Sequence, residues 1–195
     1  MNSFNFPWQF FSVILPNMAF LKDILLIDFE STGYDPVNSD PVEIGALLLD
    51  KQTLAEKASY SSLIYSDLKK ITPGSAEMWN FKAENVKAAP KIEAVGKEFI
   101  AKFGFDLIVA SWVQRLDRGM LNKLAAAAGE APEKYDYHML DLWPVAYIHL
   151  AKSGNYSGAM DSDSMFSAFG FPTRDKHGAL EDCRIEAEIF RKLYA

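Results

Sequence analysis

The sequence contains a single cysteine, Cys183, and only three histidines among its 195 residues. One cysteine permits no internal disulfide, and together with three scattered histidines it excludes a zinc-finger type of metal site. A chain with so few thiols is typical of a reducing, cytoplasmic compartment. Internal repeats and low-complexity linkers are also absent, so we expect one globular domain.

Long apolar runs and early basic residues are missing from the first twenty positions. Residues 1–20 are rich in aromatic side chains but contain no lysine or arginine, and Pro7 and Pro16 interrupt their apolar stretches. A signal peptide needs a basic start, and a membrane span needs about 20 continuous apolar residues. We therefore expect no membrane association. Residues 1–20 form an N-terminal extension, which packs on the domain at 21–195 or reflects an upstream choice of start codon.

Positive charge is in the minority, with 20 basic against 26 acidic residues and a formal net charge of −6. This balance counts mildly against a nucleic-acid partner, because phosphate binding normally uses a basic surface. It does not exclude a site in which bound metal ions supply the local positive charge. Eight side chains could form basic rims around such a site, although each is also an ordinary exposed residue: Lys69, Lys70, Lys82, Lys87, Arg115, Arg118, Arg174 and Lys176.

The order of apolar and turn-forming segments predicts a mixed α/β fold. Strands are expected at 23–30, 41–50 and 55–65, joined by short turns, which is typical of an antiparallel meander. Further strands are expected at 105–112 and 135–143. Helices are expected in pieces between 71 and 104, and then at 117–129, 143–152, 161–170 and 179–194. A meander followed by alternating helices and strands predicts a mixed sheet with helices on its faces.

Two carboxylates close the first predicted strand, in the stretch "DILLIDFESTGY". Side chains alternate across a strand, so Asp28 and Glu30 share one face with Leu26, while Ile27 and Phe29 share the other. Both faces begin apolar, which predicts a buried central strand. Two like charges at the end of such a strand repel each other and lose hydration. A divalent cation would compensate them.

Two more acids and one histidine are candidates for the same site. In the last predicted helix, Asp182 lies within about 20° of Ile189 and Leu193 on a helical wheel, so it faces inward. Glu186 lies near the same line. His177 is five residues before Asp182, so both can serve one site only if His177 lies in the loop before the helix, which Gly178 makes easy.

Asp117 stands where a buried strand gives way to a helix. Taken alone, it is explained as well by a structural role in the first helical turn, where the helix dipole favours an acid. Each of these motifs is weak by itself. Their combination and order carry more weight.

That combination resembles a known family. "DFESTG" near the start, an aspartate opening the helix after the fourth strand, and "HGALED" in the last helix are similar to the DEDDh group of DnaQ-like 3′–5′ exonucleases. The resemblance runs from about Lys22 to Leu193. It includes "PVEIGALLLD" as a second strand, "FKAENVKAAPKIEAV" after a third, and "MFSAFGFP" before the last motif. It implies a ribonuclease H-like fold.

By this resemblance the chain has five catalytic residues: Asp28, Glu30, Asp117 and Asp182 as metal-binding acids, and His177 as the base. Two Mg²⁺ or Mn²⁺ ions are implied, with Asp28 bridging both. Glu30 and Asp182 would complete the nucleophile-side site, and Asp117 would support the other ion. Hard oxygen ligands suit these ions, and His177, with an ordinary pKa of about 6.5, suits proton transfer.

The same resemblance places Ser31, Thr32 and Gly33 along the pocket for the terminal nucleotide. One departure concerns the family's usual His-Asn pair before the second aspartate, because Trp112 and Val113 stand near those places. The contacts of that pair do not carry over. Trp112 is then either core packing or a base-stacking surface, and we include it among the candidate substrate-binding residues.

The implied activity is metal-dependent removal of nucleoside 5′-monophosphates from the 3′ end of single-stranded DNA or RNA. One alternative is a module of the same fold that binds a 3′ end or a protein without cutting. Another is an endonuclease of the broader ribonuclease H-like class. The sequence leaves DNA and RNA, and a homodimer and a separate polymerase chain as partners, equally open.

Overall fold

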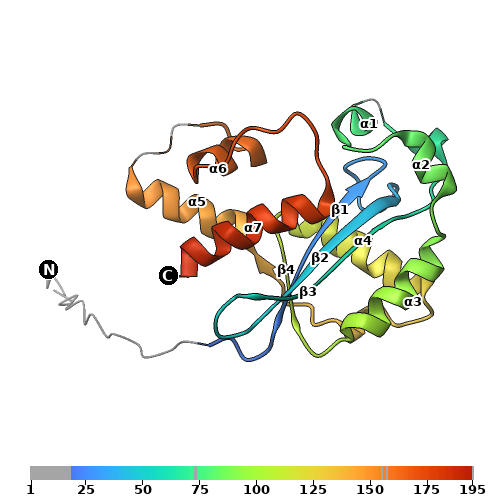
Figure 1. The fold of residues 1–195 in the computed structure, drawn as a ribbon, viewed down its shortest axis with the longest axis horizontal. Helices are drawn as coiled ribbons and strands as arrows, with labels where there is room; N and C mark the ends of the chain where they lie inside the picture. The colour runs from blue at the N-terminus through green and yellow to red at the C-terminus, as the bar shows by residue number, and fades with distance from the viewer. Residues whose placement is uncertain (1–18, 73, 155, 157, 195) are drawn as a thin grey trace, which may run out of the picture.

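The computed structural model describes residues 19–72, 74–154, 156 and 158–194. Five strands form one mixed sheet in the order β3-β2-β1-β4-β5 (Figure 1). Their bounds are β1 (Ile24–Ser31), β2 (Pro41–Leu49), β3 (Glu56–Leu63), β4 (Ile108–Ser111) and β5 (Leu140–Asp141). Neighbouring strands β1, β2 and β3 are antiparallel, whereas β4 runs parallel to β1 and β5 parallel to β4. The predicted mixed sheet, with a meander followed by parallel strands, is confirmed.

Helices cover both faces of this sheet (Figure 1). One face is covered by α5 (Leu142–Ser153), α6 (Ser162–Ala168) and α7 (Ala179–Tyr194), and the other by α3 (Ile92–Phe103) and α4 (Gln114–Ala127). The shorter elements are the helices α1 (Ser75–Met78) and α2 (Ala83–Ala88) and the 3₁₀ turns η1 (Leu68–Lys70) and η2 (Pro132–Lys134). The sheet is therefore sandwiched between two helical layers.

The alternation expected for β1 is observed. Ile24 and Leu26 belong to the core beneath α5, α6 and α7, while Leu25, Ile27 and Phe29 belong to the core beneath α3 and α4. A fully buried leucine or isoleucine side chain contributes roughly 1.5–3 kcal/mol relative to an exposed one. Two apolar cores thus hold β1 rigidly at the centre, and its last residues project from the sheet at a fixed angle.

Several element boundaries differ from the sequence-based expectation; the strand expected at 105–112, for example, is Ile108–Ser111. Two of the differences have a visible local cause. The strand expected at 135–143 shortens to Leu140–Asp141, because Tyr135 packs on Phe105 and Asp136 forms a local turn with the backbone N–H of His138. Helix α4 begins at Gln114, three residues before Asp117. The reason is local, since the Asp117 carboxylate accepts a hydrogen bond from the backbone N–H of Val113 and supports the extra turn.

The start of α7 lies directly on β2. A Cβ atom at Gly45 would fall 2.2 Å from the carbonyl carbon of Ala179, so only glycine permits this approach. The buried carboxylate of Glu43 accepts a hydrogen bond from the Ala179 N–H at 3.0 Å. Because Gly45 is the cross-strand partner of Asp28, this contact brings the first turn of α7 beside the end of β1.

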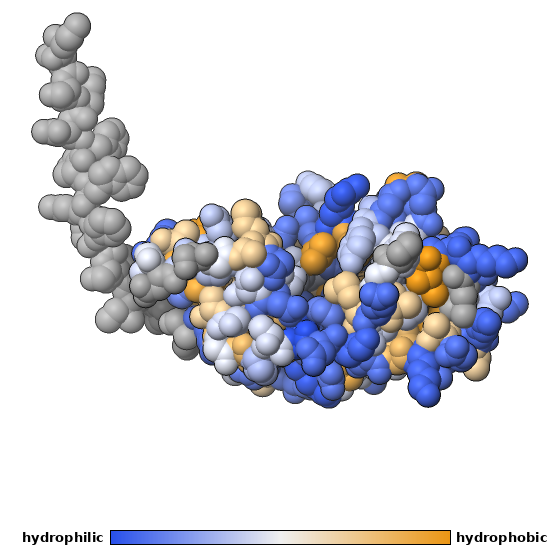
Figure 2. All heavy atoms as spheres, turned by 90° about the horizontal axis from the view of Figure 1, so that it is seen from above, coloured by the Kyte–Doolittle hydropathy of each residue, from blue (hydrophilic) through white to orange (hydrophobic). Residues whose placement is uncertain are grey.

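The predicted N-terminal extension lies almost entirely outside the described residues. Its last residue, Phe20, packs on α7, with ring centroids 5.6 Å from Phe190 and 5.0 Å from Tyr194. No helix in the described part of the chain is long and apolar enough to cross a bilayer. The face seen in Figure 2 is mostly hydrophilic, with hydrophobic residues in small groups among the polar ones.

Candidate active site

Asp28 and Glu30 lie at the carboxyl end of β1, the central strand of the sheet. Both are partly buried, and their cross-strand partners on β2 are Gly45 and Glu43. Since Gly45 has no side chain, the carboxylate of Asp28 has no neighbour from that position. The backbone of Ala179 at the start of α7 fills that space instead. The sheet thus presents the two carboxylates on one face beside the first turn of α7, and their shared face is the one that the spacing of the sequence predicts.

Asp117 enters from the other side, in the first turn of α4. Only 1% of the residue is exposed, and its Oδ2 accepts a hydrogen bond from the Val113 N–H at 3.2 Å. The structural role expected of a first-turn acid is thus present. Asp117 also borders the same cavity as Asp28 and Glu30, so the two roles coexist in one residue.

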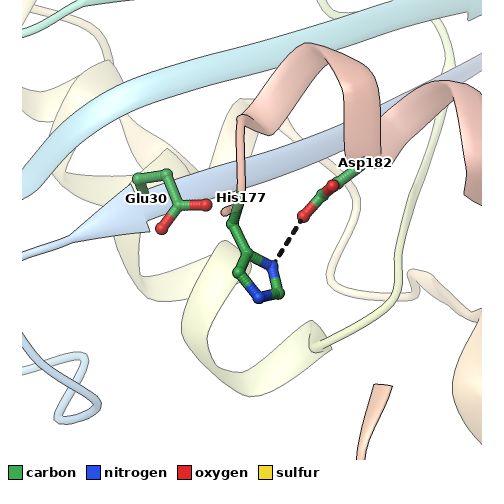
Figure 3. A group of neighbouring side chains, drawn as sticks. All are labelled: Glu30, His177 and Asp182. Carbon is green, nitrogen blue, oxygen red and sulfur yellow. Dashed lines mark hydrogen bonds and ion pairs between the residues drawn. The ribbon is translucent and has the colours of Figure 1, made fainter. Parts of the chain in front are cut away.

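Asp182 and His177 come from α7 and the loop before it (Figure 3). Asp182 is 6% exposed, which confirms its inward orientation, and its Oδ2 lies 3.3 Å from Nδ1 of His177. The placement of His177 in the loop is likewise confirmed. This loop is held in place, because the His177 N–H donates to the carbonyl of Met78 at 2.6 Å and its carbonyl accepts from the Asn80 N–H at 2.8 Å.

Gly178 follows His177 in the loop before α7. The sequence predicts that a glycine makes this loop easy to form. A Cβ atom at this position would fall 2.1 Å from the side-chain nitrogen of Asn80, so a larger residue would displace that exposed side chain. The backbone of His177 is held against the α1 region by its hydrogen bonds with Met78 and Asn80.

The five predicted catalytic side chains meet at one cavity of about 130 Å³. Within it, ligand atoms of Glu30, His177 and Asp182 lie within 4.8 Å of one another, and Figure 3 shows Glu30 and Asp182 on either side of the imidazole. Asp28 and Asp117 complete the walls. Residues separated by more than 150 positions are thus brought together at the carboxyl end of β1.

Burial and mutual repulsion change the acid–base behaviour of these groups. The pKa of Asp28 is raised well above its ordinary value, first by burial and then by the charges of Glu186, Asp117 and Asp182. Burial likewise raises the pKa of Glu30 to about 7 and that of Asp117 to about 8. Carboxyl groups with raised pKa values in one cavity are poorly compensated charges, which is the electrostatic condition that a divalent cation relieves.

Among the described residues, Arg174 is the arginine that forms an ion pair with one of these acids. Its guanidinium donates to Asp182 through Nη1 and to Asp163 through Nε at 3.1 Å, and it lies 4.6 Å from the centre of the Phe166 ring. Its side chain is only 12% exposed. The expectation that Arg174 is an ordinary exposed residue is therefore wrong, because tertiary packing buries it at the border of the acidic cavity.

The other candidate rim residues are distributed over the surface, and several have partners elsewhere. Lys70 pairs with Asp40, Arg118 donates to the carbonyl of Asp136, and Lys176 donates to the carbonyl of Glu77. Arg115 borders a second cavity beside the acidic one. It is the member of the group that the structure places nearest to a candidate substrate path.

This second cavity has a volume of about 530 Å³ and shares Trp112, Val113 and His177 with the acidic cavity. Trp143 at the start of α5 forms part of its wall and stacks on Tyr147, with ring centroids 5.3 Å apart and planes inclined by 6°. Aromatic walls beside a cluster of acids are suited to an unpaired base whose phosphate enters the acidic cavity.

The predicted substrate-binding residues contact other residues of this chain. The Ser31 hydroxyl donates to the Gly33 carbonyl at 2.6 Å, and the Thr32 hydroxyl accepts from the Asp40 N–H at 2.9 Å. These bonds hold the β1–β2 connection in shape. Trp112 is 2% exposed and packs edge-on against Phe166, so its main contact is with the core. Binding of substrate by these four residues stays a prediction.

Three functional candidates were not singled out from the sequence as site residues: Glu186, Glu43 and Asp163. Glu186 is 2% exposed and borders the acidic cavity one helical turn beyond Asp182. Its position on the inward line of the helical wheel was a usable signal. Glu43 and Asp163 gave no such signal, because their contacts with Ala179 and Arg174 depend on how separate elements pack.

A model of the exonuclease family named RNase_T matches residues 25–190, which is most of the chain and contains every residue of the acidic cavity. The chain belongs to this exonuclease family. The predicted relationship to DnaQ-like exonucleases with a ribonuclease H-like fold is thereby confirmed.

Two relatives of this exonuclease-family chain are polymerase components. It is 28% identical over 176 residues to the DNA polymerase III subunit epsilon of Aquifex aeolicus, covering 87% of this chain and 79% of that protein. It is 27% identical over 169 residues to the PolC-type DNA polymerase III of Thermotoga petrophila. That match covers 85% of this chain but only 11% of the polymerase.

Solved structures agree on the fold. E. coli exonuclease I in complex with a dT13 oligonucleotide superimposes with a TM-score of 0.74 at 12% identity, covering 89% of this chain and 41% of that one. Its zinc-bound complex with single-stranded DNA gives a TM-score of 0.71 at 13% identity, covering 87% of this chain and 40% of that one. The chain thus corresponds to about two fifths of exonuclease I.

Proposed function

We propose that this protein is a 3′–5′ exonuclease that hydrolyses the terminal phosphodiester bond of single-stranded DNA or RNA and releases nucleoside 5′-monophosphates. One observation carries the proposal. One cavity is bordered by four acids and a histidine that come from β1, α4, α7 and the loop before α7. These residues are Asp28, Glu30, Asp117, His177 and Asp182. A fold that needed these residues only for stability would have no reason to gather four acids around an imidazole.

The relatives support a nucleic-acid strand as the ligand. One relative is an epsilon subunit of DNA polymerase III, and a protein of the same fold has been seen in complex with the single-stranded oligonucleotide dT13. We infer a similar class of ligand for this chain. We also propose that residues 21–195 are the exonuclease domain, since the family model spans 25–190.

The acidic cavity fits Mg²⁺ or Mn²⁺. Its donors are hard carboxylate oxygens without a thiol among them, and the buried Oε2 of Glu186 has no hydrogen-bond partner among the described residues. Asp28, Glu30, Asp117 and Asp182 would hold the ions. Such ions, when bound, supply the positive charge that lowers the pKa of water and stabilises the developing charge on a phosphate group.

His177 is suited to be the general base. When Nδ1 carries a proton, it donates to Asp182 and leaves Nε2 to accept a proton from water. The hydrogen bond from Asp182 raises the pKa of His177 above its ordinary value of 6.5. Asp182 therefore both orients the ring and strengthens it as a base.

The larger cavity supports a single strand rather than a duplex. Trp143 on its wall can contact only a base face that is not already stacked in a helix. Arg115 on its border supplies a positive charge for a backbone phosphate. The terminal phosphodiester would then lie at His177, where the two cavities meet.

The rival function, a module that binds without cutting, has one feature in its favour. Arg174 pairs with Asp182 and so occupies one oxygen of an acid that the enzyme needs as a ligand. The second oxygen of Asp182 faces His177. An active enzyme needs space for a cation beside Asp182 even though Arg174 and His177 contact its two oxygens. A module that only binds does not need that space.

The deciding experiment uses linear single-stranded DNA and RNA labelled at the 5′ end, with Mn²⁺, with Mg²⁺ and with EDTA. We expect a ladder of shortened labelled products only with metal, and no cleavage of a circular single strand. Asp28→Asn should abolish the ladder, while Asp106→Asn, which changes an exposed acid, should not. A labelled mononucleotide as the first product would contradict 3′–5′ polarity, and binding without any shortening would favour the rival.

A further inference from the structure

Glu186 is a buried acid that the proposed catalytic set does not use. It lies in α7 four residues beyond Asp182, so both side chains are on the same helical face. Only 2% of the residue is exposed, and Oε2 has no hydrogen-bond partner among the described residues. An unpartnered buried carboxyl group costs free energy, because it loses its hydration and gains nothing in return.

Packing does not explain an acid at this place. The buried neighbours of Glu186 along α7 include Cys183, Ala187, Ile189 and Phe190, which are all apolar or weakly polar. A leucine or methionine would fill the space without an uncompensated oxygen. We therefore look for the role of this carboxyl group in the cavity that Glu186 borders.

That cavity places Glu186 among the other acids. Its pKa is raised well above the ordinary value by burial and by repulsion from Asp117 and Asp182, and Arg174 lowers it in part. Among the charges that raise the pKa of Asp28, Glu186 has the largest effect. Glu186 thus borders the same cavity as Asp28 and Asp117, and it is not part of the close trio of Glu30, His177 and Asp182.

We propose that Glu186 is an additional oxygen ligand for the divalent cation beside Asp28 and Asp117. The proposal rests on the metal-dependent function proposed above. Formal charge supports it, since the five carboxylates that border the cavity are matched by Arg174 and two divalent cations, while Asp163, which also pairs with Arg174, lies outside this cavity. With Glu186 included, the loaded site is neutral before substrate enters, which reduces the cost of burying it.

The test measures metal binding directly, without an activity assay. Full-length protein and its Glu186→Gln variant are titrated with Mn²⁺ by calorimetry, and their melting temperatures are compared in EDTA and in Mn²⁺. We expect at least a tenfold weaker Mn²⁺ affinity for Glu186→Gln. We also expect a higher melting temperature in EDTA, because a repelling buried acid is gone, and a smaller rise on adding Mn²⁺.

Three further variants complete the comparison. Glu188→Gln, an exposed acid on the same helix, should match the wild type. Glu186→Met removes the oxygen altogether and repeats the test with different packing, so it should weaken Mn²⁺ binding at least as much. Asp182→Asn separates the two proposals. If Asp182→Asn weakens binding while both Glu186 variants bind like the wild type, only this inference is overturned, whereas unchanged binding in all of them overturns the metal site itself.

Discussion

Arg174 donates to one oxygen of Asp182, while the other oxygen of the same carboxylate lies 3.3 Å from His177 Nδ1. One acid is therefore shared between a permanent cation and the candidate base. The arrangement fixes the orientation of Asp182 before any metal binds. Among the described residues, no lysine or arginine forms an ion pair with Asp28, Glu30 or Asp117. One acid of the cavity is therefore neutralised by an arginine and three are not, and this difference affects stability, metal binding and their dependence on pH.

Removing Arg174 should destabilise the metal-free protein. Breaking a buried ion pair by removing one partner costs roughly 3–5 kcal/mol when the remaining charge stays buried. One kcal/mol lowers the melting temperature of a chain of this size by about 2–4 °C. We expect Arg174→Met to melt several degrees lower in EDTA and to recover more with Mn²⁺ than the wild type does. Arg184→Met, an exposed change on α7, is the control, and equal melting temperatures would count against the pair.

Replacing His177 should separate catalysis from metal binding. As a general base it contributes about 100-fold or more to turnover, so His177→Ala should lose that factor and keep its Mn²⁺ affinity. Single-turnover rates and calorimetry measure the two quantities on the same sample. His149→Ala, which changes an exposed histidine on α5, should behave as the wild type. A large loss of Mn²⁺ affinity in His177→Ala would instead make the imidazole a metal ligand.

The stability of the metal-free protein should fall as pH rises. The folded-state pKa values of Glu30, about 7, and Asp117, about 8, are above those of the unfolded chain, so the folded protein holds more protons in between. The stabilisation is present below about pH 4 and is lost progressively as pH rises toward 8. The raised pKa of His177 acts in the same direction.

We therefore expect the melting temperature in EDTA to drop by several degrees between pH 5.5 and 8, since one pKa unit corresponds to about 1.4 kcal/mol. With saturating Mn²⁺ the decrease of the melting temperature with rising pH should become smaller or change sign, because the cation favours the ionised acids. Melting curves at five pH values with and without metal provide the measurement. A metal-free protein that gains stability up to pH 8 would show that these acids are already compensated.

Replacing Gly45 should lower turnover, although this residue does not border the acidic cavity. Its missing Cβ lets Ala179 lie directly on β2, so Gly45→Ala forces the first turn of α7 outward and carries Asp182 with it. Overpacking of this kind typically costs about 1–3 kcal/mol. We expect a lower melting temperature together with at least a tenfold loss of turnover. Ser61→Ala changes the exposed β3 partner of Gly45 and should affect neither. Full turnover in Gly45→Ala would mean that α7 can shift without moving Asp182.

Trp143 should affect the binding of substrate more than its hydrolysis. Stacking of a base on an aromatic ring contributes about 1–3 kcal/mol, so Trp143→Ala should raise KM for a single-stranded oligonucleotide by roughly tenfold with little change in kcat. Val145→Ala, an exposed change on the same helix, is the control. If KM is unchanged, the strand takes a path other than the 530 Å³ cavity.

Local sequence was sufficient for the order of most elements and for the inward orientation of the candidate acids, whereas their catalytic roles stay a prediction from the family resemblance. Apolar alternation in residues 24–30 predicts a strand buried on both faces, and the two cores on either side of β1 show it. The five-residue interval from His177 to Asp182 likewise predicts a loop followed by an inward acid. Such features depend on neighbours along the chain, whose geometry follows from backbone periodicity.

The sequence alone thus determined which side chains could act, because strand and helix periodicity orient residues that are close in the chain. Only the tertiary structure decided that Arg174 is buried on Asp182, that Glu43 holds the start of α7, and that Gly178 lies against the side chain of Asn80. These contacts join segments up to 136 positions apart. Their formation depends on how close two independently formed elements can approach, and no local pattern encodes that distance.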